Sequence, residues 1–190
     1  MYSLLPDETG CKSVLGNLVY MERKHFGFSP KVVDVTMPTS RLFGHVEYKL
    51  EISVRLAATR FVVPFPFFLA TPHNSIDSEP RLFGLITRYK ELSALYSTLA
   101  SIHRSLYLKG KFPSFAEPKY FGATDPQTIA ERRNSIEEFL QFVLNNEVLC
   151  KSVKFQQFLE STREIKEMEA VDEPTKSDEA TEAMPGGTEA

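Results

Sequence analysis

Three consecutive residues, Arg88, Tyr89 and Lys90, could bind an anion, because they stand where a predicted strand meets a predicted helix. An arginine guanidinium can hold a phosphate through two parallel hydrogen bonds. The tyrosine ring can stack on another ring, and the lysine adds a second positive charge near a helix N-terminus, which itself favours anions. The alternative is that Arg88 forms a salt bridge with a carboxylate and binds no ligand.

A second basic group, Glu131-Arg132-Arg133, lies on a later predicted helix. Arg133 comes four residues after Ile129 and three before Ile136, so it flanks the apolar stripe and points towards the domain. Two roles are open for this side chain. It is either a structural clamp or the second wall of an anion pocket.

The loop between these two groups interleaves lysines with phenylalanines, which suits contact with a membrane. Aromatic rings enter the headgroup boundary, and each lysine adds about 1 kcal/mol near anionic lipid. The alternative is that the aromatic side chains pack onto the domain; we favour it for Tyr120 and Phe121, whereas the two earlier phenylalanines could do either. The membrane-contact candidates are Lys109, Lys111, Phe112 and Phe115.

Catalysis has no support in the sequence. The four histidines stand in separate contexts without ligand spacing, and the chain has no Gly-rich phosphate loop and no G-x-S-x-G or H-E-x-x-H motif. Its two cysteines, Cys11 and Cys150, cannot build a disulfide framework or a multi-cysteine metal site. We therefore expect a protein that is not an enzyme and needs no cofactor or metal. A reducing, cytoplasmic setting is the default expectation.

Charge is divided unevenly along the chain. The 190 residues carry 22 basic and 25 acidic side chains, a net charge of −3 that excludes a nucleic-acid binder held by bulk positive charge. Residues 161–190 hold three basic and nine acidic side chains, so residues 1–160 hold 19 and 16. The average therefore hides a mildly basic region followed by a strongly acidic tail.

The elements that must position the basic residues follow from hydrophobic periodicity. Apolar and polar side chains alternate over residues 45–56, which predicts a half-buried antiparallel strand. Residues 58–64 are rich enough in β-branched and aromatic side chains to pair with it, and residues 81–89 form a further strand. Apolar residues at three- and four-residue spacing predict a helix over residues 90–107.

Further helices follow the loop 109–122. Asp125-Pro126 begins one of them, since proline at the first helical position loses no hydrogen bond, and residues 150–159 form the last. Strands thus precede helices. This order predicts an α+β fold, with a small antiparallel three-stranded sheet packed against a helical subdomain that carries a proline-rich loop.

Three parts are expected along the chain: a poorly ordered segment 1–30, a domain over residues 31–162 and a disordered acidic tail over 163–190. Within the domain, the ten-residue segment 61–70 is unusually apolar, although a bilayer span needs about 20 residues. This segment could be a membrane-contacting insertion, a partner site, a segment that packs, or a splice or gene-model artefact.

The order of motifs resembles a known family. A strand ending R-Y-K-x-L precedes an amphipathic helix, then F-P-x-F-x-x-P-K-x-F-G, then I-A-E-R-R before an apolar helix. Together these resemble the PX (phox homology) domain of sorting-nexin-like, phosphoinositide-binding proteins. The resemblance runs from about residue 34 to residue 160.

The resemblance implies a role for each matching residue. Arg88 stands where the family holds the 3-phosphate of phosphatidylinositol 3-phosphate, Tyr89 where a ring packs on the inositol, and Lys90 where a cation helps with the 1-phosphate. Arg133 stands where a side chain reaches the inositol hydroxyls. Lys119 is the candidate for the remaining 1-phosphate contact, one residue after the usual position.

The function that this resemblance implies is a phosphoinositide-binding, membrane-targeting module of endosomal trafficking or signalling. The protein would be cytoplasmic and peripherally associated with endosomal membranes, with a phosphoinositide-containing membrane as its partner and a protein partner left open. The alternative is a PX-like protein-interaction platform with only general affinity for acidic lipid. The first interpretation requires Arg88, Lys90 and Arg133 to converge on one open pocket beside the loop 109–119.

Overall fold

The structure is a computed structural model, and it describes residues 4–37, 46–56, 79–117 and 122–165, except residues 22 and 123. A sheet and a set of helices make up this part of the chain, which confirms the predicted α+β class. In chain order the elements are η1 (Glu8–Gly10), α1 (Val14–Met21), β1 (Phe26–Thr36), β2 (Glu47–Leu56), β3 (Arg81–Arg88), α2 (Tyr89–Ser105), α3 (Pro126–Asn145), η2 (Leu149–Lys151), α4 (Val153–Leu159) and β4 (Arg163–Glu164).

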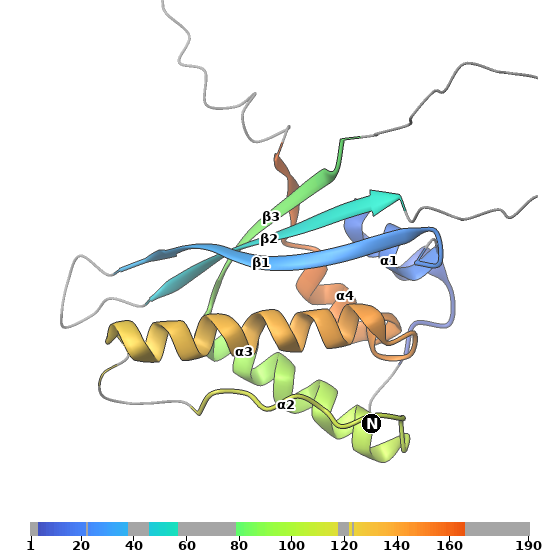
Figure 1. Cartoon of the computed structure of the whole chain (residues 1–190). Helices are drawn as coiled ribbons and strands as arrows, with labels where there is room; N and C mark the ends of the chain where they lie inside the picture. Colours follow the sequence, from blue (N-terminus) through green and yellow to red (C-terminus); the bar gives the residue numbers. More distant parts are fainter. Residues whose placement is uncertain are drawn as a thin grey trace, which may run out of the picture.

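The sheet is antiparallel, and its strands lie side by side in chain order, β1-β2-β3-β4. Along β2 the buried residues alternate with exposed or half-buried ones, as the period-2 pattern predicted. These buried side chains are Tyr48, Leu50, Ile52 and Val54. Figure 1 shows α3 and α2 on one side of the sheet, so the apolar faces of strands and helices meet in one hydrophobic core.

The number of strands differs from the prediction, because the described residues form four rather than three. Two observed strands, β1 and β4, were not predicted; β1 pairs with β2 along its length, whereas the predicted strand 58–64 lies outside the described residues. Phe28, Pro30 and Val32 are buried at alternate positions of β1, but Gly27 and Pro30 interrupt the apolar pattern in the sequence. Proline is tolerated here because β1 is an edge strand.

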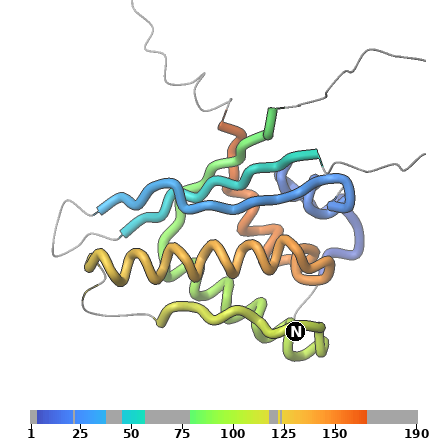
Figure 2. Tube along the Cα trace, in the orientation of Figure 1, coloured from blue at the N-terminus to red at the C-terminus, as the bar shows by residue number. Residues whose placement is uncertain are grey.

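The predicted poorly ordered segment 1–30 also differs from the structure. Leu15 and Val19 on α1 are fully buried in the core, and the Nε atom of Arg23 donates a hydrogen bond of 2.7 Å to the carbonyl of Leu144. Figure 2 shows this blue part of the trace against the orange part near the C-terminal end. Two apolar residues one helical turn apart are too short a pattern to predict a buried helix from sequence.

The helices begin close to the predicted positions. α2 covers Tyr89–Ser105, where residues 90–107 were predicted, and α3 begins at Pro126 behind Asp125 as its N-cap. α4 lies within the predicted range 150–159. None of the helices in the described ranges has both the length and the hydropathy that crossing a bilayer requires.

The predicted tail 163–190 begins too early, because Arg163–Glu164 form β4 at the edge of the sheet and pair with Phe83 and Gly84. The guanidinium of Arg81 on β3 binds both carboxylate oxygens of Glu164, each at 2.9 Å. Residues 166–190 lie outside the described residues.

Candidate functional site

Arg88 stands at the junction that the sequence predicted, as the last residue of β3 and the N-cap of α2. A neighbouring carboxylate holds this junction. Glu91 Oε2 accepts a hydrogen bond of 2.9 Å from the hydroxyl of Thr87 and one of 3.3 Å from the N–H of Arg88. The helix start is therefore held by a side chain other than the Arg88 guanidinium, which leaves that guanidinium available.

The guanidinium of Arg88 lies at the surface, with its Nε atom 3.5 Å from Oε1 of Glu47 on the neighbouring strand. The salt bridge considered from the sequence as the alternative is thus present. Both side chains are well exposed, 52% and 39%, and such pairs contribute only about 0–1 kcal/mol. An anion can therefore compete with Glu47 for Arg88. Lys90 is also exposed, on the first turn of α2.

Tyr89 turns inwards and is only 7% exposed. Its ring stacks on Phe115 with 5.2 Å between centroids, and its hydroxyl donates a hydrogen bond to the carbonyl of Ala116. Burial raises the pKa of the Tyr89 hydroxyl to about 12, and the nearby charge of Arg132 opposes that rise only in part. The broad ring face that the family resemblance implies for Tyr89 is therefore largely covered by the protein itself.

Arg132 is the residue that the sequence analysis missed. Its Cζ atom lies 4.1 Å from the centroid of the Tyr89 ring, a cation–π contact, and the side chain is only 4% exposed. Its Nε atom is buried without a hydrogen-bond partner, and no carboxylate among the described residues forms a salt bridge with it. A buried cation without a counter-charge is costly to the fold.

A sequence signal for Arg132 did exist. The residue lies four positions before Ile136 and seven before Phe139, both fully buried on α3, so it occupies the apolar stripe itself. A charged residue at a core position of an amphipathic helix is a candidate for function or for a buried contact.

Arg133 binds the backbone of β1 and takes the first of its two open roles, the structural clamp. Its Nη2 atom donates a hydrogen bond of 2.9 Å to the carbonyl of Val32, and Glu137 Oε1 accepts one of 2.8 Å from the N–H of the same residue. The register of β1 against β2 shifts between Val32 and Asp34. Side chains of α3 thus supply partners to the backbone of an edge strand where its ladder is irregular.

The two phenylalanines of the predicted membrane loop pack onto the domain. The Phe112 ring lies against His103 and Phe142, at centroid distances of 5.2 and 5.3 Å, and Phe115 stacks on Tyr96 at 4.7 Å. Both are only partly exposed and belong to the edge of the hydrophobic core. Of the two alternatives left open for these rings, the structure shows packing onto the domain, because aromatic partners on α2 and α3 contact them.

The lysines of the predicted site are placed differently. Lys109 and Lys111 are exposed at the beginning of the loop, while Lys119 lies outside the described residues. Two cavities lie elsewhere on the described surface, and neither is lined by Arg88, Lys90 or Arg133.

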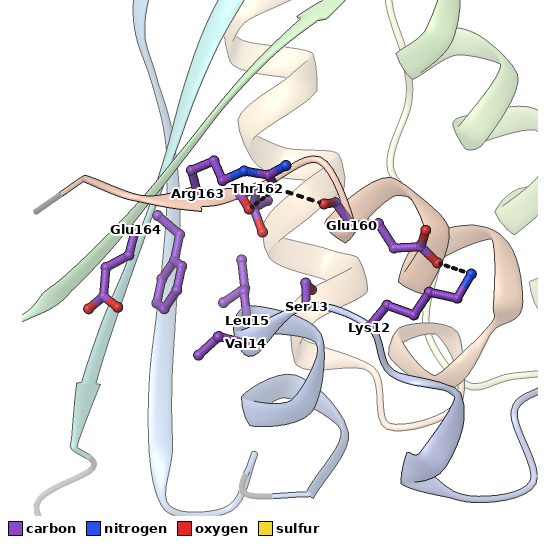
Figure 3. A pocket seen from close by; sticks show the side chains of 9 residues that line it. Lys12, Ser13, Val14, Leu15, Glu160, Thr162, Arg163 and Glu164 are labelled. Carbon is purple, nitrogen blue, oxygen red and sulfur yellow. Dashed lines mark hydrogen bonds and ion pairs between the residues drawn. The ribbon is translucent and has the colours of Figure 1, made fainter. Parts of the chain in front are cut away.

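One of those cavities, of about 160 Å³, lies between α1 and the end of α4. Figure 3 shows that its polar groups bind one another: Lys12 Nζ lies 3.6 Å from Glu160 Oε1, and Arg163 Nη1 donates hydrogen bonds to the carbonyls of Glu160 and Thr162. Its cations are thus already paired within the chain. Among the described residues, no cluster of His, Cys, Asp or Glu is suited to a metal ion.

The other cavity, of about 650 Å³, is a groove on the sheet face turned away from the helices. Its lining mixes apolar side chains such as Val33 and Ile86 with charged ones such as Lys49 and Arg163. Ile86 is 60% exposed there.

Comparison with known proteins matches the region that holds both Arg88 and Arg132. The family model of the PX domain matches residues 83–162. Over 72 residues, 37% of this chain, the sequence is 38% identical to ribosomal protein S6 kinase delta-1 of Mus musculus and 32% identical to sorting nexin-15 of Homo sapiens. The matched segment makes up only 7% and 21% of those two proteins.

A solved structure with similarity to the chain is described as an X-ray structure of a designed CISK-PX domain. The superposition covers 68% of this chain and 96% of that chain, with 17% sequence identity and a TM-score of 0.45.

Proposed function

The chain belongs to the PX domain family through residues 83–162, and we propose that it is a non-enzymatic module that binds a phosphoinositide headgroup at a membrane surface. The headgroup we propose is that of phosphatidylinositol 3-phosphate. Such binding would recruit the cytoplasmic protein reversibly to endosomal membranes, in trafficking or in signalling. The site is the pair of guanidiniums of Arg88 and Arg132 at the start of α2, together with the exposed charge of Lys90.

The observation that carries this proposal is the buried Nε atom of Arg132, which has no hydrogen-bond partner among the described residues. A structural arginine at 4% exposure is expected to have a carboxylate or several carbonyls as partners, but its Nε atom has none among the described residues. A bound anion removes this deficit, because it supplies negative charge and acceptor oxygens in a place of low dielectric constant, where charge-assisted hydrogen bonds are strong.

Arg88 and Lys90 complete the site at the surface. Arg88 precedes Tyr89 directly, and Arg132 lies over the Tyr89 ring, so both arginines are next to this tyrosine. Tyr89 itself is held by Phe115 and by the carbonyl of Ala116. We therefore assign Tyr89 the role of holding Arg132 in place, in addition to any contact between the edge of its ring and the inositol.

Arg133 has a different task in this proposal. Its guanidinium is bound to the backbone of β1, so the role that the resemblance implied for Arg133, contact with the inositol hydroxyls, passes to Arg132. The two residues are neighbours, and a family motif with two consecutive arginines does not by itself say which one faces the ligand.

Vesicle sedimentation tests the proposal. Wild-type protein is expected to prefer vesicles of phosphatidylcholine, phosphatidylserine and phosphatidylinositol 3-phosphate over vesicles without the phosphoinositide. Arg88→Ala and Arg132→Met should each reduce that preference about tenfold or more, because each deletes a charge-assisted hydrogen bond of about 1.5–3 kcal/mol. Arg55→Ala is the matched control, since Arg55 is an exposed arginine of the same sheet about 26 Å along β2 from Glu47.

Wild-type protein that binds both vesicle types equally would refute the specific-headgroup proposal. The groove beside Ile86 on the outer sheet face would then favour the second candidate, a protein-interaction platform with only general affinity for acidic lipid. The segment 61–70, which motivated this alternative from the sequence, lies outside the described residues.

A further inference from the structure

The end of α2 carries an exposed apolar pair, Leu106 and Tyr107. Tyr107 is 92% exposed, the largest value among the exposed large hydrophobic side chains in the described part of the chain, and Leu106 is 48% exposed. In Figure 1 this end of α2 lies at the bottom of the view, away from the sheet. A tyrosine that contacts so little of its own protein contributes almost nothing to the core.

The backbone at Tyr107 is also unusual. Its φ of 49° makes it the one non-glycine residue with a positive φ in the described ranges. It directly follows the C-cap of α2, a position where glycine is preferred because a Cβ atom is strained there. The turn is closed by hydrogen bonds of 3.2 Å from Tyr107 N–H to the Arg104 carbonyl and 3.1 Å from Leu108 N–H to the His103 carbonyl. The chain thus keeps a strained, solvent-exposed aromatic residue where glycine would be more stable.

The charged residues close in sequence to this pair are all basic. Between Glu91 and Glu117 the sequence contains no acidic residue, and the side chains of Arg104, Lys109 and Lys111 are all exposed. Since none of these cations has a carboxylate close in sequence, their field adds at the surface. This is charge complementarity to a partner that is itself negative.

We propose that Arg104, Leu106, Tyr107, Lys109 and Lys111, the α2-end surface, form a second membrane contact that binds anionic lipid without headgroup specificity. A tyrosine ring with a polar tip suits the interface between headgroups and acyl chains, and clustered cations suit an anionic leaflet. Phe112, one of the two phenylalanines that the sequence left open to membrane contact, instead packs on His103 in the last turn of α2, next to this surface.

This contact is separate from the proposed headgroup site. α2 has 17 residues, so its two ends are about 25 Å apart. That distance exceeds the Debye length of about 8 Å at physiological ionic strength, so the charges of one site act little on the other. Neither of the two described cavities includes a residue of the α2-end surface.

The decisive variant is Tyr107→Gly, because the proposal predicts opposite effects on stability and on binding. Glycine adopts the positive φ without strain, so the melting temperature should stay equal or rise by about 2–4 °C. Binding to vesicles of phosphatidylcholine and phosphatidylserine, without phosphoinositide, should weaken about tenfold through loss of the buried ring. Lys109→Gln with Lys111→Gln should weaken it further, about fivefold per lysine at low salt.

Two controls separate this proposal from the headgroup proposal. Lys31→Gln removes an exposed lysine of β1 and should change binding to phosphatidylserine vesicles less than twofold, while Arg88→Ala should keep most of that binding and lose only the phosphoinositide preference. Unchanged binding of Tyr107→Gly to phosphatidylserine vesicles would overturn the proposal, as would a lower melting temperature. A protein partner at this surface would produce the first of these results.

Discussion

Exchanging Arg132 or Arg133 for methionine alters neighbouring positions of α3, and the two variants should behave in opposite ways. Arg132→Met removes the cation over the Tyr89 ring, a contact of about 2 kcal/mol when desolvated. It also removes a buried Nε atom that has no acceptor, which costs the folded state about 1–3 kcal/mol. Methionine keeps an unbranched apolar stem in the same space. The free energy of unfolding should therefore change by no more than about 1 kcal/mol.

Arg133→Met should instead destabilise the fold. It deletes the hydrogen bond of 2.9 Å from a charged group to the Val32 carbonyl, and bonds of that kind contribute about 1.5–3 kcal/mol. The Glu137 carboxylate, which accepts from the Val32 N–H, would also lose its neighbouring cation. A loss of about 2 kcal/mol lowers the melting temperature of a domain of this size by about 4–8 °C.

Urea unfolding and phosphoinositide binding, measured on both variants, give the assay. The expected result is that Arg132→Met keeps wild-type stability and loses the preference for phosphatidylinositol 3-phosphate, whereas Arg133→Met loses stability and keeps the preference at a temperature where it is folded. Equal loss of binding with equal loss of stability in both variants would refute the reasoning. If the free energy of unfolding fell by about 3 kcal/mol in Arg132→Met alone, this side chain would be structural.

Three further predictions concern charge. Glu47→Gln should strengthen binding to phosphoinositide vesicles a few-fold in sedimentation, because it frees Arg88 from its one carboxylate partner among the described residues; weaker binding would contradict this. Burial raises the pKa of Cys150 from 9.0 to about 11 and that of Tyr89 from 10.0 to about 12, so the unfolded state loses these protons first as the pH rises. The free energy of unfolding is then highest below about pH 9 and falls as the pH rises to about 12. Measured by urea unfolding, Cys150→Ala should show a smaller fall in this free energy between pH 9 and 11 than the wild type. An equal fall in both proteins would contradict this. Ending the chain after Ile165 removes eight acidic and two basic side chains, so binding to anionic vesicles at low salt should strengthen, and weaker binding would assign the removed residues a positive role.

The local elements of this protein could be predicted because their signals are local. The alternation along β2, the apolar stripe of α2 and the Asp125-Pro126 start of α3 each lie within one element, and the structure confirms them. β1 was missed for a tertiary reason. Its irregular backbone at Val32 is stable because two side chains of α3, more than 100 residues later, supply hydrogen bonds to it.

The candidate site likewise contains some residues that the sequence could place and others that only tertiary packing could place. The cluster from Arg88 to Lys90 is evident from residue types at a strand-to-helix junction, and the structure places it there. Phe112 and Phe115 could face lipid or protein on sequence grounds alone, because a loop has no period. Only the aromatic partners on α2 and α3 decided that they pack inwards.

The sequence by itself determined that β2 and β3 are strands and that α2, α3 and α4 are helices, because the pattern of apolar side chains reflects the period of each of these elements. It also determined that the positive charge precedes the acidic tail. The tertiary structure alone decided between two adjacent arginines. Neighbouring residues of a helix point about 100° apart, so the packing of α3 against β1 and α2 turns Arg133 to a backbone carbonyl and buries Arg132 over Tyr89, with no salt bridge to any carboxylate of the described residues.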